Sequence, residues 1–258
     1  MTRTIPQVRT QAQGTVPQEL LERARQKVEH LCARAPEPVI SARVRLTQMA
    51  SPSASRPAIA QANLDVGGRP VRAQAGAATM TEAIDLLEDR LSERLGRVAR
   101  HWEAIRGGQP RPHEWRHNAE PTQRPAYYPR PAEDRQVIRH KAYELATATP
   151  DEAAFDMEAL DYDFHLFTDT ATEQDSVIYR HGDAYRMAQL DPRPPREPLA
   201  IELTVSPQPA PRLNVDQATE RLEETGLPFV FFADERTGRG NLLYHRYDGH
   251  YGLITPAG

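Results

Sequence analysis

The second half of the sequence contains one pattern twice, 65 residues apart. Residues 163–169 (Asp-Phe-His-Leu-Phe-Thr-Asp) align with residues 228–234 (Pro-Phe-Val-Phe-Phe-Ala-Asp). Further pairs follow at this offset and then after a one-residue gap: Val177-Ile178-Tyr179 with Leu242-Leu243-Tyr244, and Tyr185-Arg186-Met187 with Tyr251-Gly252-Leu253. A repeat at a fixed offset indicates one supersecondary unit used more than once. We therefore expect residues 136–190 and 201–258 to form two copies of one small domain.

Each copy is predicted to fold in the order β-α-β-β-β. Residues 149–152 (Thr-Pro-Asp-Glu) combine an N-cap, a proline at the first helical position and a capping-box glutamate. Asn214 and Gln217 have the same roles in the second copy. The strand before each helix is expected at residues 143–145 and 201–205.

Both copies are expected to have apolar residues on both faces of their sheets. Phe229 and Phe231 point to one face of a strand, whereas Val230 and Phe232 point to the other. One helix covers only one face, so the second face needs another cover. We predict that the two sheets cover each other, and that the pairing residues are Phe164, Leu166, Tyr179, Phe229, Phe231 and Tyr244.

Residues 1–106 predict a separate α+β domain of order β-α-β-β-β-α. Residues 40–47 alternate apolar and polar side chains, as in a half-buried strand. Residues 58–66 and 70–76 flank Gly67-Gly68, and two glycines suit the positive φ angles of a tight hairpin. A weaker strand is predicted at residues 8–13. We expect a four-stranded sheet with both helices on one face.

Two capping boxes predict where the helices of this domain begin. Thr15 stands three residues before Gln18, and Thr79 stands three residues before Glu82. The second helix is expected to be long, because apolar residues recur at three- and four-residue spacing as far as Trp102.

Charge is separated along the chain. Residues 1–106 hold 16 Arg and Lys against 11 Asp and Glu, whereas residues 142–258 hold 9 against 21. This separation favours binding of a polyanion such as RNA by the N-terminal domain. Arginine suits this role because its planar guanidinium grips phosphate with two hydrogen bonds. The predicted RNA-binding residues are Arg23, Lys27, Arg43, Arg45, Arg72, Arg90, Arg94, Arg97, Arg100 and His101.

The basic stripe on the second helix has two interpretations. Arg90, Arg94, Arg97 and His101 recur at steps of four, three and four residues, which places them on one helix face. One interpretation is an RNA-binding surface. The other is a solvated face whose cations pair with the acids of the same helix: Asp85, Glu88, Asp89 and Glu93.

Residues 107–135 predict an extended linker, because six prolines between Pro110 and Pro131 prevent a continuous helix or sheet ladder. Residues 191–200 form a second, shorter linker. The aromatic residues Trp115, Tyr127 and Tyr128 stand among arginines, as in an RNA-stacking arm or simply a solvated linker.

Residues 113–117 (His-Glu-Trp-Arg-His) match the H-E-x-x-H zinc pattern, but the flanking prolines argue against the helix that this pattern needs. No glycine-rich phosphate loop or serine elbow is visible either. We therefore expect no metal, no cofactor and no enzymatic activity. The single cysteine, Cys32, and the lack of a long apolar segment favour a soluble cytoplasmic protein without membrane contact.

Several motifs resemble the long-form ribosome hibernation-promoting factors, also called sigma-54 modulation proteins. They are Val137-Ile138-Arg139-His140-Lys141, Met157-Glu158 with residues 163–168, and residues 244–254. The resemblance implies that the N-terminal domain binds 16S rRNA in the decoding region of the small ribosomal subunit. There it would block the sites of messenger and transfer RNA and inhibit translation under stress.

The duplicated C-terminal domain departs from that family pattern. In usual long forms, a single C-terminal domain pairs between two molecules and joins two ribosomes. The linker at residues 191–200 is short, so pairing within one chain should prevail over pairing between chains. We therefore predict a cytoplasmic, ribosome-associated factor that silences single ribosomes. The alternatives are a ribosome-dimerising factor and a general RNA-binding stress regulator.

Overall fold

The computed structural model describes residues 6–35, 37–49, 57–107, 134–182, 184–195, 198–246 and 249–257. The chain divides into two compact units. The N-terminal unit comprises residues 1–126 and the short segment 158–162, and the C-terminal unit comprises residues 127–157 and 163–258. The zinc-like motif at residues 113–117 and the aromatic residues Trp115, Tyr127 and Tyr128 lie outside the described residues.

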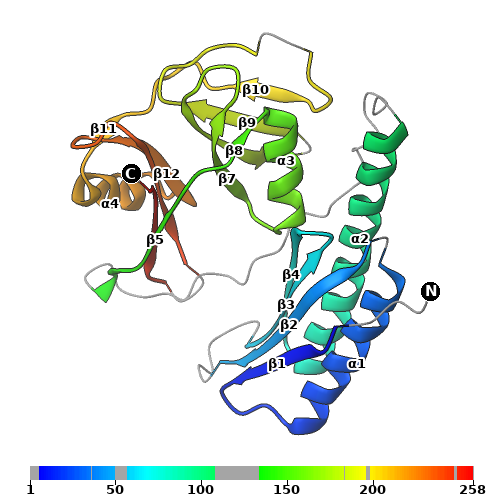
Figure 1. Ribbon diagram of the computed structural model, residues 1–258. Helices are drawn as coiled ribbons and strands as arrows, with labels where there is room; N and C mark the ends of the chain where they lie inside the picture. Colours follow the sequence, from blue (N-terminus) through cyan, green and yellow to red (C-terminus); the bar gives the residue numbers. More distant parts are fainter. Residues whose placement is uncertain are drawn as a thin grey trace. The chain divides into compact units, whose positions relative to one another are not determined.

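The N-terminal unit has the predicted α+β fold. Its elements are β1 (Val8–Gln13), α1 (Gln18–Arg34), β2 (Val39–Gln48), β3 (Ala58–Val66), β4 (Arg69–Ala77) and α2 (Met80–Gly107). Among the described residues the strands form a four-stranded sheet in the order β1-β2-β3-β4, with only the β1–β2 pair parallel. Both helices lie on one face of this sheet (Figure 1).

Alternating side chains place the core of this unit between the sheet and its helices. Val44 and Leu46 of β2 are fully buried, as are Val71 of β4 and Leu91 of α2. The free thiol of Cys32 on α1 lies in the same core, and burial raises its pKa to about 11. In the described residues the other face of the sheet is polar, and at β4 the segment 158–162 lies against it, where Arg72 donates to the Leu160 carbonyl and lies over the Tyr162 ring.

The turn and one of the two predicted caps are confirmed in this unit. Gly67 and Gly68 have φ angles of 60° and 87°, which a two-residue hairpin requires. The Thr79 hydroxyl accepts from the Glu82 amide at 3.3 Å, and the Glu82 carboxylate accepts from the Thr79 amide at 3.1 Å. The capping box predicted at Thr15 is wrong, because Pro17 is the N-cap and its carbonyl accepts from the Leu20 amide.

The C-terminal unit contains the two copies. The first has β5 (Val137–Tyr143), β6 (Thr147–Ala148), α3 (Pro150–Ala159), β7 (Phe164–Asp169), β8 (Asp175–His181) and β9 (Ala184–Gln189). The second has β10 (Leu203–Val205), β11 (Arg212–Leu213), α4 (Val215–Thr225), β12 (Phe229–Asp234), β13 (Gly240–His245) and β14 (Tyr251–Pro256). Both predicted helix caps are confirmed, at Thr149 with Glu152 and at Asn214 with Gln217.

The two copies exchange their first strands. Within the described residues, one sheet has the order β10-β9-β8-β7-β6 and the other has the order β11-β12-β13-β14-β5. The strand β5 precedes the first copy but pairs in parallel with β14 of the second, and β10 pairs in the same way with β9 of the first (Figure 1). The predicted single strand at residues 143–145 is therefore wrong, because β5 leaves for the other sheet and β6 starts a new strand after Leu145.

Side-chain contacts anchor each exchanged strand to its host copy. Arg135, before β5, donates to the Glu223 carboxylate of α4 at 2.7 Å. Glu223 also accepts from the Tyr251 hydroxyl, whose pKa is raised to about 12 by burial and by this hydrogen bond. On the other side, the Asp151 carboxylate of α3 accepts from the Ala200 and Ile201 amides at 3.0 and 3.1 Å. The exchange is thus held by polar contacts as well as by backbone pairing.

Candidate nucleic-acid and repeat-pairing interfaces

The face of the N-terminal sheet opposite the helices carries two transverse rows of polar side chains. Strand register places Arg9, Arg43, Asn63 and Arg72 in one row across β1 to β4. The neighbouring row is Gln11, Arg45, Gln61 and Gln74. Arg43 and Arg45 are exposed, and neither pairs with a carboxylate in the part of the chain that the structure describes. This face therefore offers guanidinium and amide groups to a ligand rich in acceptors, such as RNA.

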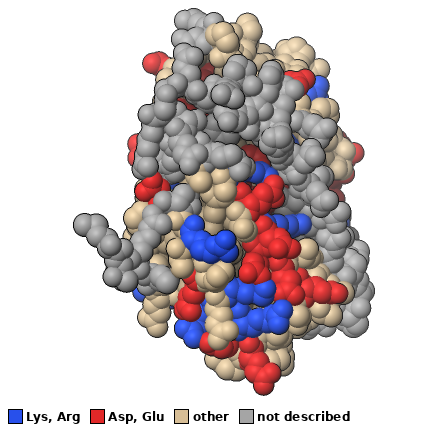
Figure 2. Space-filling view, turned by 90° about the vertical axis from the view of Figure 1, so that its right-hand side faces the viewer, with Lys and Arg blue, Asp and Glu red and all other residues tan. Residues whose placement is uncertain are grey.

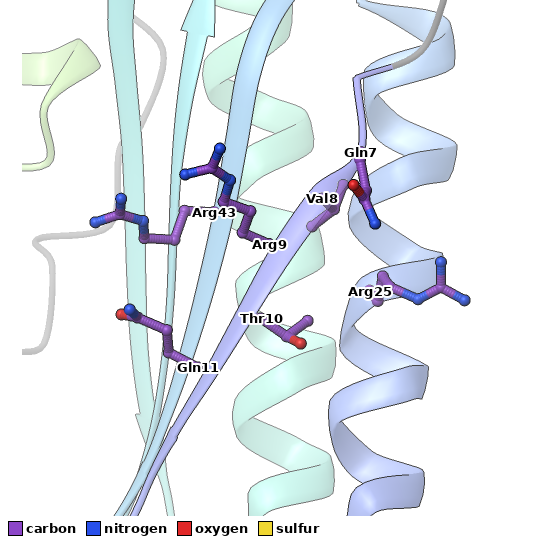
Figure 3. A pocket seen from close by; sticks show the side chains of 7 residues that line it. All are labelled: Gln7, Val8, Arg9, Thr10, Gln11, Arg25 and Arg43. Atoms are coloured by element: carbon purple, nitrogen blue, oxygen red, sulfur yellow. The ribbon is translucent and has the colours of Figure 1, made fainter.

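Arg9 belongs to this surface but was not among the predicted residues. Its side chain and those of Gln11 and Arg43 line a shallow hollow along the edge strand β1 (Figure 3). Arg9 stands directly opposite Arg43 because β1 pairs in parallel register with β2. Residues 8–13 give only a weak strand signal, so the sequence alone did not place Arg9 beside Arg43.

The helices carry a face of mixed charge rather than a continuous basic surface. Arg23 of α1 donates to Asp85 of α2 at 2.9 Å, and Lys27 pairs with Asp85 and Glu88. These contacts lower the pKa of Asp85, with the hydrogen bond from Arg23 as the largest cause, and raise that of Lys27. Figure 2 shows basic and acidic side chains interleaved over this face. Because Arg23 and Lys27 are on α1, they lie on the opposite side of the sheet from Arg43 and Arg45. The carboxylates of Asp85 and Glu88 neutralise the charges of Arg23 and Lys27.

The predicted stripe on α2 is engaged within the N-terminal unit. Arg90 donates to the Gln74 carbonyl of β4 at 2.5 Å. Arg97 pairs with Glu93 one turn earlier and with Glu158 at 2.8 Å, while Arg94 is buried and pairs with Asp161. Glu158 and Asp161 lie in the segment 158–162. A phosphate group would have to replace these carboxylates to bind Arg94 or Arg97. The side chains of Arg100 and His101 lie outside the described residues.

The predicted pairing residues come together in one apolar cluster in the C-terminal unit. Its buried members come from both copies: Leu145, Phe164, Leu166 and Val177 from the first, and Phe231, Leu242 and Ile254 from the second. Tyr179, Phe229 and Tyr244 pack against it. The cluster is separate from the core under α4, which contains Leu222 and Phe232. Each sheet of this unit thus uses one face for its helix and the other for the second copy.

Aromatic contacts in this cluster occur in symmetric pairs. The rings of Phe164 and Phe229, which are equivalent residues, lie 5.0 Å apart. Phe164 lies 5.3 Å from Tyr244, and the reciprocal contact of Phe229 with Tyr179 measures 5.2 Å. A contact repeated with the copies interchanged is the property of a two-fold interface. The two copies therefore pair about an approximate two-fold axis within this chain.

His165 marks a difference on the helix-facing side of the first copy. Its ring stacks on that of Phe167, and burial lowers its pKa to about 4. Among the described residues its Nε2 atom has no hydrogen-bond partner. The second copy has Val230 at this position. His165 is therefore a neutral, buried side chain and belongs to neither candidate interface.

Among the described residues, no group of three or more His, Cys, Asp or Glu side chains is placed to hold a metal ion. No helix in the described ranges is long and apolar enough to span a membrane.

Models of one protein family match both units of the chain. The model of the sigma 54 modulation protein/S30EA ribosomal protein matches residues 8–102. The model of its C terminus matches twice, at residues 132–186 and 205–253. A double match of the C-terminal model agrees with the internal repeat.

Two relatives and one solved structure match different fractions of this chain. A dormancy associated translation inhibitor of Mycobacterium tuberculosis is 43% identical over 84% of this chain and 77% of its own length. A ribosome hibernation promotion factor of Deinococcus radiodurans is 28% identical over 65% of this chain and 91% of its own. The structure of a ribosomal subunit interface protein from Coxiella burnetii covers 35% of this chain and 94% of its own, at 20% identity and a TM-score of 0.30. The chain belongs to the long-form ribosome hibernation factor family, with a duplicated C-terminal domain.

Proposed function

We propose that this chain is a cytoplasmic ribosome hibernation factor that binds 16S rRNA in the decoding region of the small subunit. In that position it blocks the sites of messenger and transfer RNA and inhibits translation under stress. It acts by binding rather than by catalysis. Membership of the family and the names of the two relatives support the general role, and the polar sheet face supports RNA binding.

The observation that supports RNA binding most is the group of arginines on the sheet face opposite the helices. Arg43 and Arg45 are exposed two residues apart on β2. Arg72 continues the row of Arg43 on β4, where it is half-buried and contacts the Leu160 carbonyl and the Tyr162 ring. Phosphate oxygens accept the bidentate hydrogen bonds that arginine offers, and amide side chains of the second row add donors and acceptors for bases. We propose that Arg43 and Arg45 contribute most, joined by Arg72 once RNA replaces its contacts with Leu160 and Tyr162. Among the other predicted cations, Arg94 and Arg97 contribute once RNA replaces their carboxylate partners.

Matched variants test this assignment. Alanine at Arg43, Arg45 and Arg72 together should weaken binding to purified ribosomes by about tenfold or more. The salt dependence of binding should flatten by roughly one unit of slope per lost phosphate contact. Alanine at Arg193, an exposed cation of the C-terminal unit that pairs with Asp191, serves as the control and should leave affinity unchanged. Unchanged affinity of the triple variant would refute the sheet-face assignment.

A second triple variant compares the helix stripe with the sheet face. Alanine at Arg90, Arg94 and Arg97 should weaken binding less than the sheet-face triple does. A larger loss would move the main contact surface to α2. Equal affinity of the wild-type protein for ribosomes and for free RNA of similar length would instead favour a general RNA-binding regulator.

We further propose that the protein acts on single ribosomes. Pairing of the copies within one chain supplies both exchanged strands and buries the apolar cluster, so in the described residues this pairing surface is already occupied. The short linker gives the copies an effective concentration of about millimolar, which favours pairing within the chain. Sedimentation of ribosomes with added protein should give a single-ribosome peak. A ribosome-dimer peak that depends on residues 136–258 would favour the dimerising alternative.

A further inference from the structure

One buried charge lies in the interface between the two copies. Asp175 at the start of β8 is only 4% exposed. Its carboxylate accepts from the Arg239 guanidinium at 2.8 and 3.1 Å and from the Gly240 amide at 2.8 Å. Asp175 belongs to the first copy, whereas Arg239 and Gly240 belong to the second. A buried carboxylate needs such partners, because desolvation strongly penalises an unpaired charge.

Asp175 and Gly240 occupy the same position in the two copies. Their separation in sequence is the repeat offset of 65 residues, and both begin the strand after the first hairpin turn. Phe164 and Phe229 are also equivalent and also touch. In a two-fold interface, a position that contacts its own counterpart lies on the axis. If two identical copies paired in this way, residue 175 would face residue 175.

The axis has room for one side chain only. A Cβ atom added at Gly240 would lie 2.6 Å from the Cβ of Asp175 and 2.8 Å from the ring of Phe231. Two first copies would therefore clash at Asp175, and two buried carboxylates would face each other. They would also lack the guanidinium, because Gln174 stands where Arg239 stands. Two second copies would bring two Arg239 side chains together with no carboxylate between them.

We propose that Asp175, Arg239 and Gly240 form a selector that allows only unlike copies to pair. The interface accepts a first copy with a second copy and rejects either copy with itself. Like-with-like assembly between chains is therefore excluded by residues on the axis, in addition to the effect of the short linker. This inference rests on the closed pairing of the proposed function and adds the residues that specify it.

A double-mutant cycle on the full-length chain tests the selector. Gly240→Asp places carboxylates on both sides of the axis and should lower the thermal midpoint of the C-terminal unit by roughly 10 °C. It should also reduce the amide hydrogen-exchange protection of β7 and β12. Adding Asp175→Gly restores one aspartate and one glycine, so the double variant should regain at least half of the lost midpoint. Independent damage at two sites predicts the opposite, a double variant no more stable than Gly240→Asp.

Exchanging residues 174 and 239 as well as residues 175 and 240 makes the test more stringent. Gln174→Arg with Arg239→Gln, added to the double variant, moves the complete set of groups to the opposite copies and should recover more stability still. Arg236→Asp adds an acid to the exposed part of the same hairpin and should leave the midpoint unchanged. If Gly240→Asp alone does not fold, a folded double variant gives the same support.

The selector is overturned if neither combined variant exceeds Gly240→Asp in stability, or if Gly240→Asp equals the wild type. Every measurement uses the protein without ribosomes. A wild-type protein that joins ribosomes would therefore refute the proposed single-ribosome action while leaving this cycle to judge the selector separately.

Discussion

The two C-terminal copies have the same elements in the same order, but their side chains differ at particular places. Equivalent apolar positions such as Val177 and Leu242 are fully buried in both copies. By contrast, Asp175 corresponds to Gly240, Arg186 to Gly252 and His165 to Val230. A copy whose partner is covalently attached is free to become unlike it, because the interface never has to satisfy a pair of identical surfaces. The difference suggests that duplication was followed by specialisation of each half.

The largest expected effect is the loss of packing in the shared cluster. Leu242→Ala should reduce the free energy of unfolding by about 2–5 kcal/mol, since a buried leucine leaves a cavity. Val177→Ala at the equivalent position removes less volume and should cost about 2 kcal/mol. Urea titration followed by circular dichroism measures both. A larger cost at Val177 would break the assumed equivalence of the two positions.

Acid should destabilise the first copy through His165. Its pKa is 6.5 in an ordinary environment and about 4 when buried in the fold, so the unfolded chain binds a proton more readily. Stability is therefore fully present above pH 6.5 and falls as the pH decreases towards 4, by up to about 3 kcal/mol.

His165→Val copies the residue of the second copy and should abolish this part of the pH dependence. Unfolding by urea at pH 4.5 and at pH 7.5 provides the comparison. If both proteins lose the same stability on acidification, the carboxylates of the fold cause the loss and His165 does not.

Gly252 should tolerate its counterpart's residue poorly. A Cβ atom at Gly252 would lie 2.4 Å from the Tyr244 ring, which packs on the shared cluster. Gly252→Arg should therefore displace Tyr244 and cost about 1–3 kcal/mol. Arg186→Gly in the other copy should cost only about 1 kcal/mol, through backbone entropy. Thermal unfolding of the two variants measures the contrast, and equal losses would contradict it.

The smallest expected effect is the same in both copies. Thr149→Ala and Asn214→Ala each remove the side chain that caps a helix and should cost about 1 kcal/mol. Glu220→Ala on the exposed face of α4 should change stability by less than about 0.5 kcal/mol. A marked difference between the two caps would indicate that one helix depends less on its own N-terminus.

Local signals predicted much of the fold. The hairpin at Gly67-Gly68 and the caps at Thr79, Thr149 and Asn214 involve residues within four positions of one another, so the sequence shows all the partners. Thr15 failed as a cap because Pro17 takes that place with its carbonyl. The apolar face of the repeats was visible from the alternation of side chains.

Features that depend on distant partners could not be predicted in the same way. The pairing of Arg23 with Asp85 requires the packing of α1 against α2, which one helix's periodicity does not contain. Arg9 required the strand order, and the exchange of β5 and β10 required knowledge of which sheet each strand joins. The predicted RNA-binding residues consequently lie on both faces of the domain rather than on one.

The exchanged strands have a consequence for synthesis of the chain. During synthesis on the ribosome, the sheet of the first copy cannot be completed before β10 is made, and β10 ends at Val205. The strand β5 remains unpaired for longer, because its partner β14 begins only at Tyr251. The sheet of the first copy therefore lacks its last strand until β10 is made, and the sheet of the second copy, which includes β5, is completed last. Contacts so distant in sequence form slowly, so a newly made molecule should be the form most open to a wrong partner.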